Sequence, residues 1–185
     1  SSAASDVYKR QAPSFKARET LKAVHSAKAT SLYGVPTMFI NELEEAHDQE
    51  EYGSPYDLSL LRTGVMAGTS CPSKTMRDVM DKLNMREIAI CYGMTETSPV
   101  SFQTRADSPL EKRVNTVGQI MPHLEARIIC EETGETLPRG EQGEVVVRGY
   151  SVMKEYWEHP EKTAEAIDTD GCCLLYTSPS PRDAT

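Results

Sequence analysis

Short apolar stretches alternate with amphipathic helical stretches through the first half of the chain, and this alternation limits the fold more than any other feature. Apolar residues recur at helical spacing over residues 14–27 and 36–47, with a short apolar strand ended by Gly34 between them. The alternation continues with a polar loop at 47–57, a mixed apolar segment at 58–66, a helix opening at Pro72 and a buried strand at 87–91. Alternating strands and helices form βαβ units, so we expect a parallel sheet.

After about residue 104 the pattern changes to strands joined by turns. Residues 126–130 and 144–148 are typical of strands, and the turn-forming sequences ETGE and PRGEQG lie between them. We therefore expect an antiparallel β region there, followed by a last helix near Pro160. The predicted fold class is α/β, with an α/β subdomain over residues 12–108 and a β-rich subdomain over residues 109–172.

The two ends of the chain are related in a way that is independent of folding. Residues 6–11 (DVYKRQ) and 173–178 (CLLYTS) can be encoded by one DNA segment read from opposite strands, and chance agreement over six residues is improbable. Both ends also resemble translated adapter sequence. We therefore predict that residues 1–11 and 173–185 are non-native segments, and we leave them out of the fold prediction. The native residue at position 172 stays open, because the codon of Cys172 can include one adapter base.

The composition argues against several classes of function. The 185 residues are 38% hydrophobic and 26% charged, which is ordinary for a globular protein, and the net charge is -8. An acidic chain without a Lys/Arg cluster is a poor match for nucleic acid or an anionic membrane surface. No apolar run approaches the roughly 20 residues that a membrane span needs. The five cysteines form no CxxC pair and no His/Cys metal spacing.

The most informative segment is IAICYGMTETSP, in which an apolar strand runs into Tyr92 and Gly93. Ligands of open α/β sheets bind outside the carboxyl ends of the strands. There, Tyr92 offers a flat face to a purine, and Gly93 permits close backbone approach. Thr95 offers a hydroxyl to a phosphate, and Glu96 offers a hard oxygen to Mg²⁺, which usually takes one or two carboxylates plus substrate phosphates. Taken alone, these residues fit a buried tyrosine and an exposed loop glutamate better, because short motifs often match by chance.

YGMTE resembles the Y-G-x-T-E motif of the adenylate-forming (AMP-binding) superfamily, which includes acyl-CoA synthetases and luciferases. Other segments resemble that family in the same order along the chain. They are YGVPTMF near the acyl pocket, VMAGTSCP as the glycine loop against the adenine, VGQIMPHLEARI, GEVVVRGYSVMKEYW, and DTDG before a W-x-x-T-G-D element. The resemblance covers nearly all of residues 12–172. Within the superfamily, IMPHLEARI and RGYSVMKEYW are most similar to the medium-chain acyl-CoA ligases of animal mitochondria.

The resemblance implies part of the large N-terminal domain of such an enzyme, in which a parallel βαβ sheet precedes a distorted antiparallel β-barrel. It also implies the substrates: a fatty acid attacks ATP to give an acyl-adenylate, and CoA then takes the acyl group as a thioester. ATP, Mg²⁺ and CoA are therefore the expected cofactors and co-substrates. By the same resemblance Glu96 holds Mg²⁺, and Thr95 and Glu96 are the catalytic residues. The expected nucleotide-binding residues are Gly68, Thr69, Tyr92, Gly93, Met94 and Thr95.

Several parts that such an enzyme requires do not occur in the chain. It has no phosphate loop of the TSGTTGxPK kind, and the C-terminal catalytic Lys would follow residue 172. We therefore expect the polypeptide by itself to be an inactive and poorly folded piece of a fatty acid–CoA ligase, an acid–thiol ligase. The alternatives are another adenylate-forming enzyme, such as a coumarate-CoA ligase or a luciferase-like oxidase, and a non-catalytic AMP- or acyl-binding relative. The closest resemblance implies a mitochondrial location, and a cytoplasmic one is the alternative.

Overall fold

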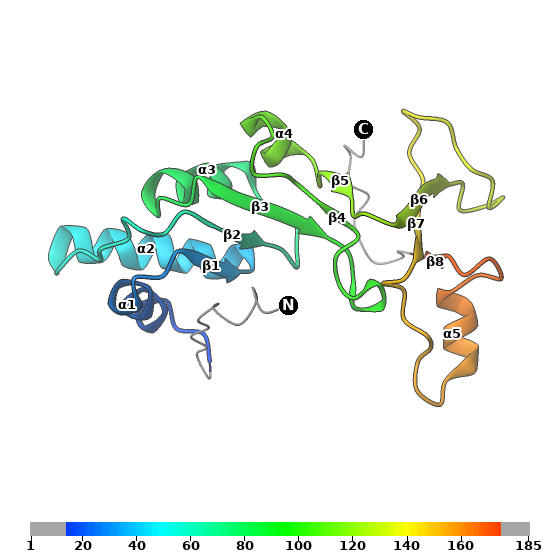
Figure 1. Cartoon of the computed structure of the whole chain (residues 1–185), viewed down its shortest axis with the longest axis horizontal. Helices are drawn as coiled ribbons and strands as arrows, with labels where there is room; N and C mark the ends of the chain where they lie inside the picture. The colour runs from blue at the N-terminus through cyan, green and yellow to red at the C-terminus, as the bar shows by residue number, and fades with distance from the viewer. Residues whose placement is uncertain (1–13, 175–185) are drawn as a thin grey trace, which may run out of the picture.

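The computed structural model describes residues 14–174, which form two sheets joined in chain order (Figure 1). In the first sheet three strands pair in parallel and two shorter strands extend it in antiparallel orientation. These strands are β1 (Ser31–Gly34), β2 (Thr63–Met66), β3 (Glu87–Tyr92), β4 (Phe102–Gln103) and β5 (Gln119–Ile120). The second sheet is antiparallel and consists of β6 (Leu124–Ile129), β7 (Glu144–Gly149) and β8 (Cys173–Leu174).

Four helices bury their apolar sides against one face of the first sheet. They are α1 (Ala17–Ala27), α2 (Pro36–Tyr52), α3 (Ser73–Lys82) and α4 (Leu110–Asn115). Phe39 of α2 and Met76 of α3 pack in one cluster with Met66 and Ile88 of the sheet. Successive side chains of a strand point to opposite faces, so the other face of the parallel strands is left to form one wall of a hollow.

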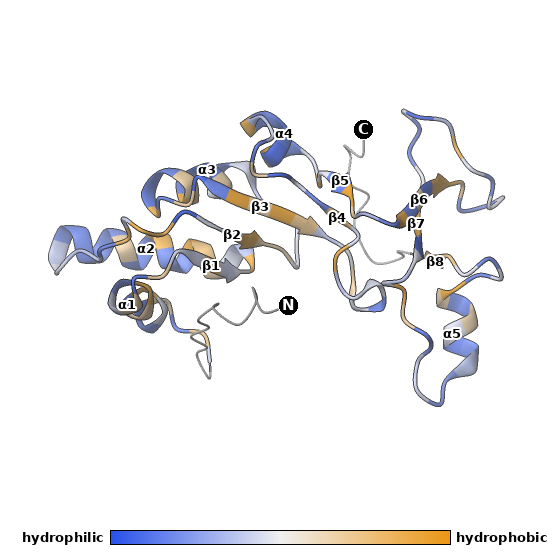
Figure 2. Ribbon diagram, viewed as in Figure 1, coloured by the Kyte–Doolittle hydropathy of each residue, from blue (hydrophilic) through white to orange (hydrophobic). Residues whose placement is uncertain are grey.

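The predicted parallel sheet is confirmed, and the hydropathy of its central strand shows why. In β3, Ile88, Ala89 and Ile90 are all buried, and Figure 2 shows an apolar strand beside helices whose outer sides are polar. The helices cover the face of Ile88 and Ile90, and Ala89 on the opposite face is also buried, so the strand needs a continuous apolar run rather than alternation. The run at residues 87–91 is therefore the feature of the sequence that places β3 in the centre.

One expected boundary needs correction. The predicted loop at 47–57 begins as helix, because α2 continues through Tyr52; its Glu and Gln residues are good helix formers, and Gly53 ends it. The first sheet includes β5, which follows residue 108 in the chain. Residues 173 and 174, which lie in the predicted adapter segment, form β8, because backbone groups pair with a neighbouring strand whatever the origin of the segment.

The second sheet confirms the antiparallel expectation as an open three-stranded sheet, from which α5 (Pro160–Ala166) extends to one side (Figure 1). Its apolar side chains pack against the end of the first sheet: Leu124, Val145 and Val147 form a cluster with Tyr92 and Phe102. No helix within residues 14–174 has both the length and the apolar character needed to cross a bilayer.

Candidate active site

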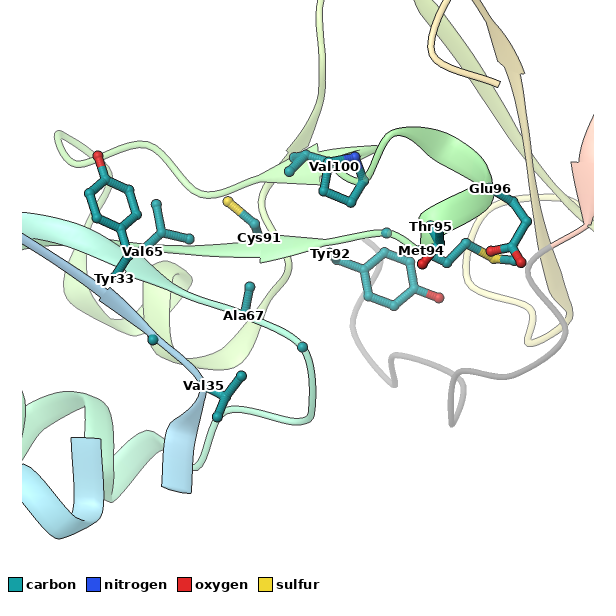
Figure 3. A pocket seen from close by; sticks show the side chains of 14 residues that line it. Tyr33, Val35, Val65, Ala67, Cys91, Tyr92, Met94, Thr95, Glu96 and Val100 are labelled. Carbon is teal, nitrogen blue, oxygen red and sulfur yellow. The ribbon is translucent and has the colours of Figure 1, made fainter. Parts of the chain in front are cut away.

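A hollow of about 660 Å³ lies at the carboxyl ends of the three parallel strands, where ligands of α/β sheets bind (Figure 3). Its lining includes six of the predicted site residues: Gly68, Tyr92, Gly93, Met94, Thr95 and Glu96. The loops that follow β2 and β3 bring these residues together, although about 25 positions separate the two loops in the sequence. The predicted site residues from both loops therefore share one cavity.

The turn after β3 fixes the entrance to this hollow. A side chain at Gly93 would place its Cβ 2.1 Å from the Pro99 carbonyl oxygen, so only glycine fits there. Thr97 is fully buried and closes the turn: its backbone N–H donates to the Met94 carbonyl at 2.9 Å, and its Oγ1 accepts from the Met94 N–H at 3.1 Å. The buried Thr97 therefore holds the short 3-10 helix Thr95–Thr97, which presents Thr95 and Glu96.

Tyr92 contributes an aromatic surface at the end of β3. Its ring packs against the Phe102 ring, with 6.0 Å between centroids and 59° between planes, and the residue is half-buried in the wall of the hollow. Gly68 lines the same hollow from the loop after β2, with a φ of +99° that favours glycine. An aromatic ring and a bare backbone in one hollow are suited to binding a planar base.

Thr69 does not join the other predicted residues. It is exposed on the loop after Gly68 and does not line the hollow, while its carbonyl accepts a hydrogen bond from the Cys71 thiol at 3.5 Å. The loop reads AGTSCP, and the same Cys71 thiol also lies 3.6 Å from the Met66 carbonyl oxygen. The resemblance alone could not place Thr69, because the amino-acid sequence of this loop differs from the one usual in the family.

The rest of the wall is mostly apolar apart from the Tyr33 hydroxyl, and its residues were not predicted as site residues. Val35, Val65, Ala67 and Val100 line it together with the Cys91 thiol (Figure 3). Burial raises the pKa of Cys91, so the thiol stays protonated and adds no charge. Side chains alternate between the two faces of β2 and β3, and the helices cover the face of Met66 and Ile90. This alternation could have identified Val65 and Cys91, on the other face, as lining residues.

Glu96 is held by a segment that lies about 60 positions later in the chain. The Tyr156 hydroxyl donates to Glu96 Oε1 at 2.5 Å, and the Met153 N–H donates to the Glu96 carbonyl at 2.7 Å. The hydrogen bond to Glu96 is the main reason why the pKa of Tyr156 rises to about 12. Tyr156 was not among the predicted site residues, although it lies in the RGYSVMKEYW segment that resembles the family.

The oxygen atoms of Thr95 and Glu96 at this turn are suited to coordinate a hard cation that is also coordinated by a substrate. Within residues 14–174 no group of three or more His, Cys, Asp or Glu side chains could hold a metal ion on its own. Glu96 supplies one half-buried carboxylate to the hollow, and the exposed Thr95 hydroxyl is its neighbour. Mg²⁺ is commonly bound by one or two carboxylates plus phosphate oxygens and water, so these residues fit Mg²⁺ that arrives with a nucleotide.

Sequence comparisons identify a matching family and similar proteins. The family model described as "AMP-binding enzyme" matches residues 2–157. The chain is 47% identical over 151 residues to "Putative acyl-CoA synthetase YngI" of Bacillus subtilis, which covers 82% of the chain and 27% of the relative. It is 40% identical over 158 residues to the mitochondrial medium-chain acyl-CoA ligase ACSF2 of Homo sapiens, covering 85% of the chain and 25% of the relative. The chain therefore spans about a quarter of the length of these relatives.

Solved structures show the same fold. ATP-bound MatB from Rhodopseudomonas palustris matches with a TM-score of 0.73 and 31% identity, over 89% of this chain and 31% of that one. The anthranilate CoA ligase AuaEII, in complex with anthranoyl-AMP, matches with a TM-score of 0.74 and 24% identity over 86% of this chain and 29% of that one, a likeness that concerns the fold alone. The family model covers most of the chain, and the relatives agree with it. The chain belongs to the AMP-binding enzyme family.

Proposed function

We propose that this chain supplies the adenine- and metal-binding edge of the active site in an ATP-dependent fatty acid–CoA ligase. The observation that carries the proposal is the hollow in which Gly68, Tyr92, Thr95 and Glu96 meet at the carboxyl ends of the parallel strands. The acyl-CoA synthetases among the relatives support the ligase class.

Each residue has a defined task in the proposed site. The Tyr92 ring stacks on the adenine, and the bare backbone at Gly68 and Gly93 lets the nucleotide approach closely. The Thr95 hydroxyl donates to a phosphate oxygen, and Met94 borders the acyl group. These groups bind and orient, which is the main protein contribution to transfer at phosphorus.

The proposed reaction has two steps that share this site. The carboxylate oxygen of the fatty acid attacks the α-phosphorus of ATP, the bond to pyrophosphate breaks, and an acyl-adenylate forms. The thiol sulfur of CoA, losing its proton, then attacks the acyl carbon and AMP leaves. Mg²⁺, when bound, neutralises phosphate charge, and Glu96 is the residue of this chain that would hold it.

The apolar wall supports a fatty acyl substrate over a charged one. Val35, Val65, Ala67 and Val100 are apolar, and Tyr33 adds an uncharged hydroxyl, so these lining side chains supply no positive charge to a second carboxylate or a phosphate. A medium-chain fatty acid is the substrate that the ACSF2 relatives suggest, and coumarate-type acids and luciferins are the alternatives within the family. A mitochondrial location is proposed on the same basis, although YngI is a bacterial protein.

The test is fatty-acid-dependent exchange of pyrophosphate into ATP by the full-length protein, with a panel of aliphatic and aromatic acids. We expect exchange with medium-chain acids and a loss of at least about 100-fold for Glu96→Gln, since removal of a group that stabilises transition-state charge costs that much. Glu141→Gln is the matched control, because Glu141 is exposed and lies outside the hollow. Full exchange by Glu96→Gln would refute the role of Glu96, and no exchange by the wild type with any acid would favour a non-catalytic relative.

A further inference from the structure

We propose that Tyr156 is a positioning residue, which holds the Glu96 carboxylate in the orientation that receives the nucleotide-bound divalent cation. This inference rests on the proposed function, because it takes Glu96 as the cation ligand. It extends that function to a residue in the segment between β7 and α5. Tyr156 acts through Glu96 and need not touch the substrate.

The contact joins two parts of the chain that fold on different sheets. Glu96 follows β3 of the first sheet, and Tyr156 follows β7 of the second. Two hydrogen bonds connect Glu96 to the segment after β7. The Tyr156 hydroxyl donates to Glu96 Oε1 at 2.5 Å, and the Met153 N–H donates to the Glu96 carbonyl at 2.7 Å. Backbone and side chain of Glu96 are therefore fixed by the same short segment, which is a stronger restraint than either bond alone.

Tyr156 is itself held in place by the start of α5. Its backbone N–H donates to Thr163 Oγ1 at 2.9 Å, and that hydroxyl donates to the His159 carbonyl at 2.9 Å. The Thr163 N–H donates to the same carbonyl at 3.0 Å. A chain of hydrogen bonds therefore runs from the first turn of α5 through Tyr156 to Glu96. A group that orients a ligand in this way needs a fixed base of its own.

The chemistry of the donor suits a carboxylate that must stay available to a cation. A tyrosine hydroxyl donates one proton and carries no charge, so it orients Glu96 without cancelling its negative charge as a Lys or Arg would. It uses one lone pair of Oε1, and within residues 14–174 it is the carboxylate's hydrogen-bond donor. An unrestrained Glu would lose side-chain entropy on binding a ligand. Tyr156 removes part of that cost in advance.

The experiment measures cation affinity directly, by calorimetric titration of Mg²⁺ into the full-length protein saturated with a non-hydrolysable ATP analogue. We expect Tyr156→Phe, which removes only the hydroxyl, to weaken Mg²⁺ binding by about 10-fold or more, the usual effect of losing a partner that orients a metal ligand. Binding of the analogue in EDTA should stay unchanged. Tyr150→Phe is the matched control: Tyr150 lies in the same segment, 73% exposed, and does not line the hollow.

A double-mutant cycle separates positioning from a general structural role. If Tyr156 acts through Glu96, Tyr156→Phe should weaken Mg²⁺ binding in the wild type and have no further effect in Glu96→Gln. Equal losses in both backgrounds, or unchanged affinity in Tyr156→Phe, would overturn the proposal. If Glu96→Gln leaves the Mg²⁺ affinity unchanged, the proposed role of Glu96 as the cation ligand fails, whatever the effect of Tyr156→Phe. Thr163→Val offers a second route should Tyr156→Phe fail to fold: it keeps the hydroxyl of Tyr156, loosens its backbone, and should weaken Mg²⁺ binding by a smaller factor. Unchanged affinity there would also count against the proposal.

Discussion

Glu42 is an ionisable side chain inside the helical layer. It lies on α2 three residues after Phe39, and both residues are almost fully buried. No hydrogen-bond partner for its Oε2 is found in the part of the chain that the structure describes. Loss of hydration raises the pKa of Glu42 from 4.5 to about 8, so the carboxyl is mostly protonated at neutral pH.

The raised pKa of Glu42 predicts a pH-dependent stability. The folded state holds a proton on Glu42 that the unfolded state has lost, so stability is greatest below pH 4.5 and falls as pH rises through about 8. Glu42→Gln cannot ionise at this position. Between pH 4.5 and about 8, we expect its free energy of unfolding to rise relative to that of the wild type by up to about 1.4 kcal/mol per pH unit. Urea unfolding of the full-length protein at pH 5.5, 7 and 8.5 measures this difference. Glu44→Gln, an exposed change on the same helix, should show no such trend. A constant difference between wild type and Glu42→Gln would contradict the burial of Glu42.

The turn after β3 is the element on which the candidate site depends. It combines a glycine in close contact, a buried Thr97 and a three-residue 3-10 helix, all within a few positions. The strand before it is anchored in the core by Ile88 and Ile90, so its end is rigid. A rigid strand followed by a tight turn is a common way to present functional side chains at a sheet edge.

We expect Gly93→Ala to disrupt this turn. The added Cβ would meet the Pro99 carbonyl at 2.1 Å, and overpacking of this kind costs about 1–3 kcal/mol. Gly134→Ala is a suitable comparison, because Gly134 has a φ of +71° with nothing within 4 Å of a new Cβ. It should cost only the left-handed strain of about 1–2 kcal/mol. Unfolding free energies and nucleotide affinity of both variants check this, and equal nucleotide affinity in the two would show that the turn tolerates a side chain.

At the scale of the whole molecule, the site lies where the two sheets meet. Tyr92 packs in one apolar cluster with Leu124 and Val147 of the second sheet, and Glu96 is bonded to Met153 and Tyr156. Both sides of the Tyr92–Glu96 turn thus depend on residues that follow it in the sequence. The second sheet therefore serves as a support for the candidate site as well as a separate layer.

We predict that the 185-residue chain alone forms no acyl-adenylate. It contains no TSGTTGxPK-like phosphate loop, and it spans 25–27% of its acyl-CoA synthetase relatives. Charge stabilisation at phosphorus requires donors on several sides of the phosphates, and this chain lines one side. Incubation with ATP, Mg²⁺ and a panel of fatty acids, with mass spectrometry of the products, is the measurement. The full-length protein is the positive control, and appreciable adenylate from the isolated chain would contradict the prediction.

The local features of the fold could be predicted because they depend on residues that are close together in the sequence. Pro36 and Pro72 mark where α2 and α3 begin, and the apolar run of β3 marks a buried strand. These signals depend on backbone preferences and on burial of neighbouring residues, which a window of a few residues contains. The motif YGMTE predicted Tyr92, Thr95 and Glu96 through its resemblance to a family motif, which a short window can also contain.

The pairing of Glu96 with Tyr156, the burial of Glu42 and the position of Thr69 outside the hollow were decided by the tertiary structure alone. For Glu96 and Glu42 the outcome depends on which distant segment packs against the residue: the segment before α5 for Glu96 and the helical layer for Glu42. For Thr69 it depends on the path of its own loop, which leaves the residue exposed. A sequence pattern fixes which face of an element is apolar, and the packing of whole elements then decides which polar side chains meet.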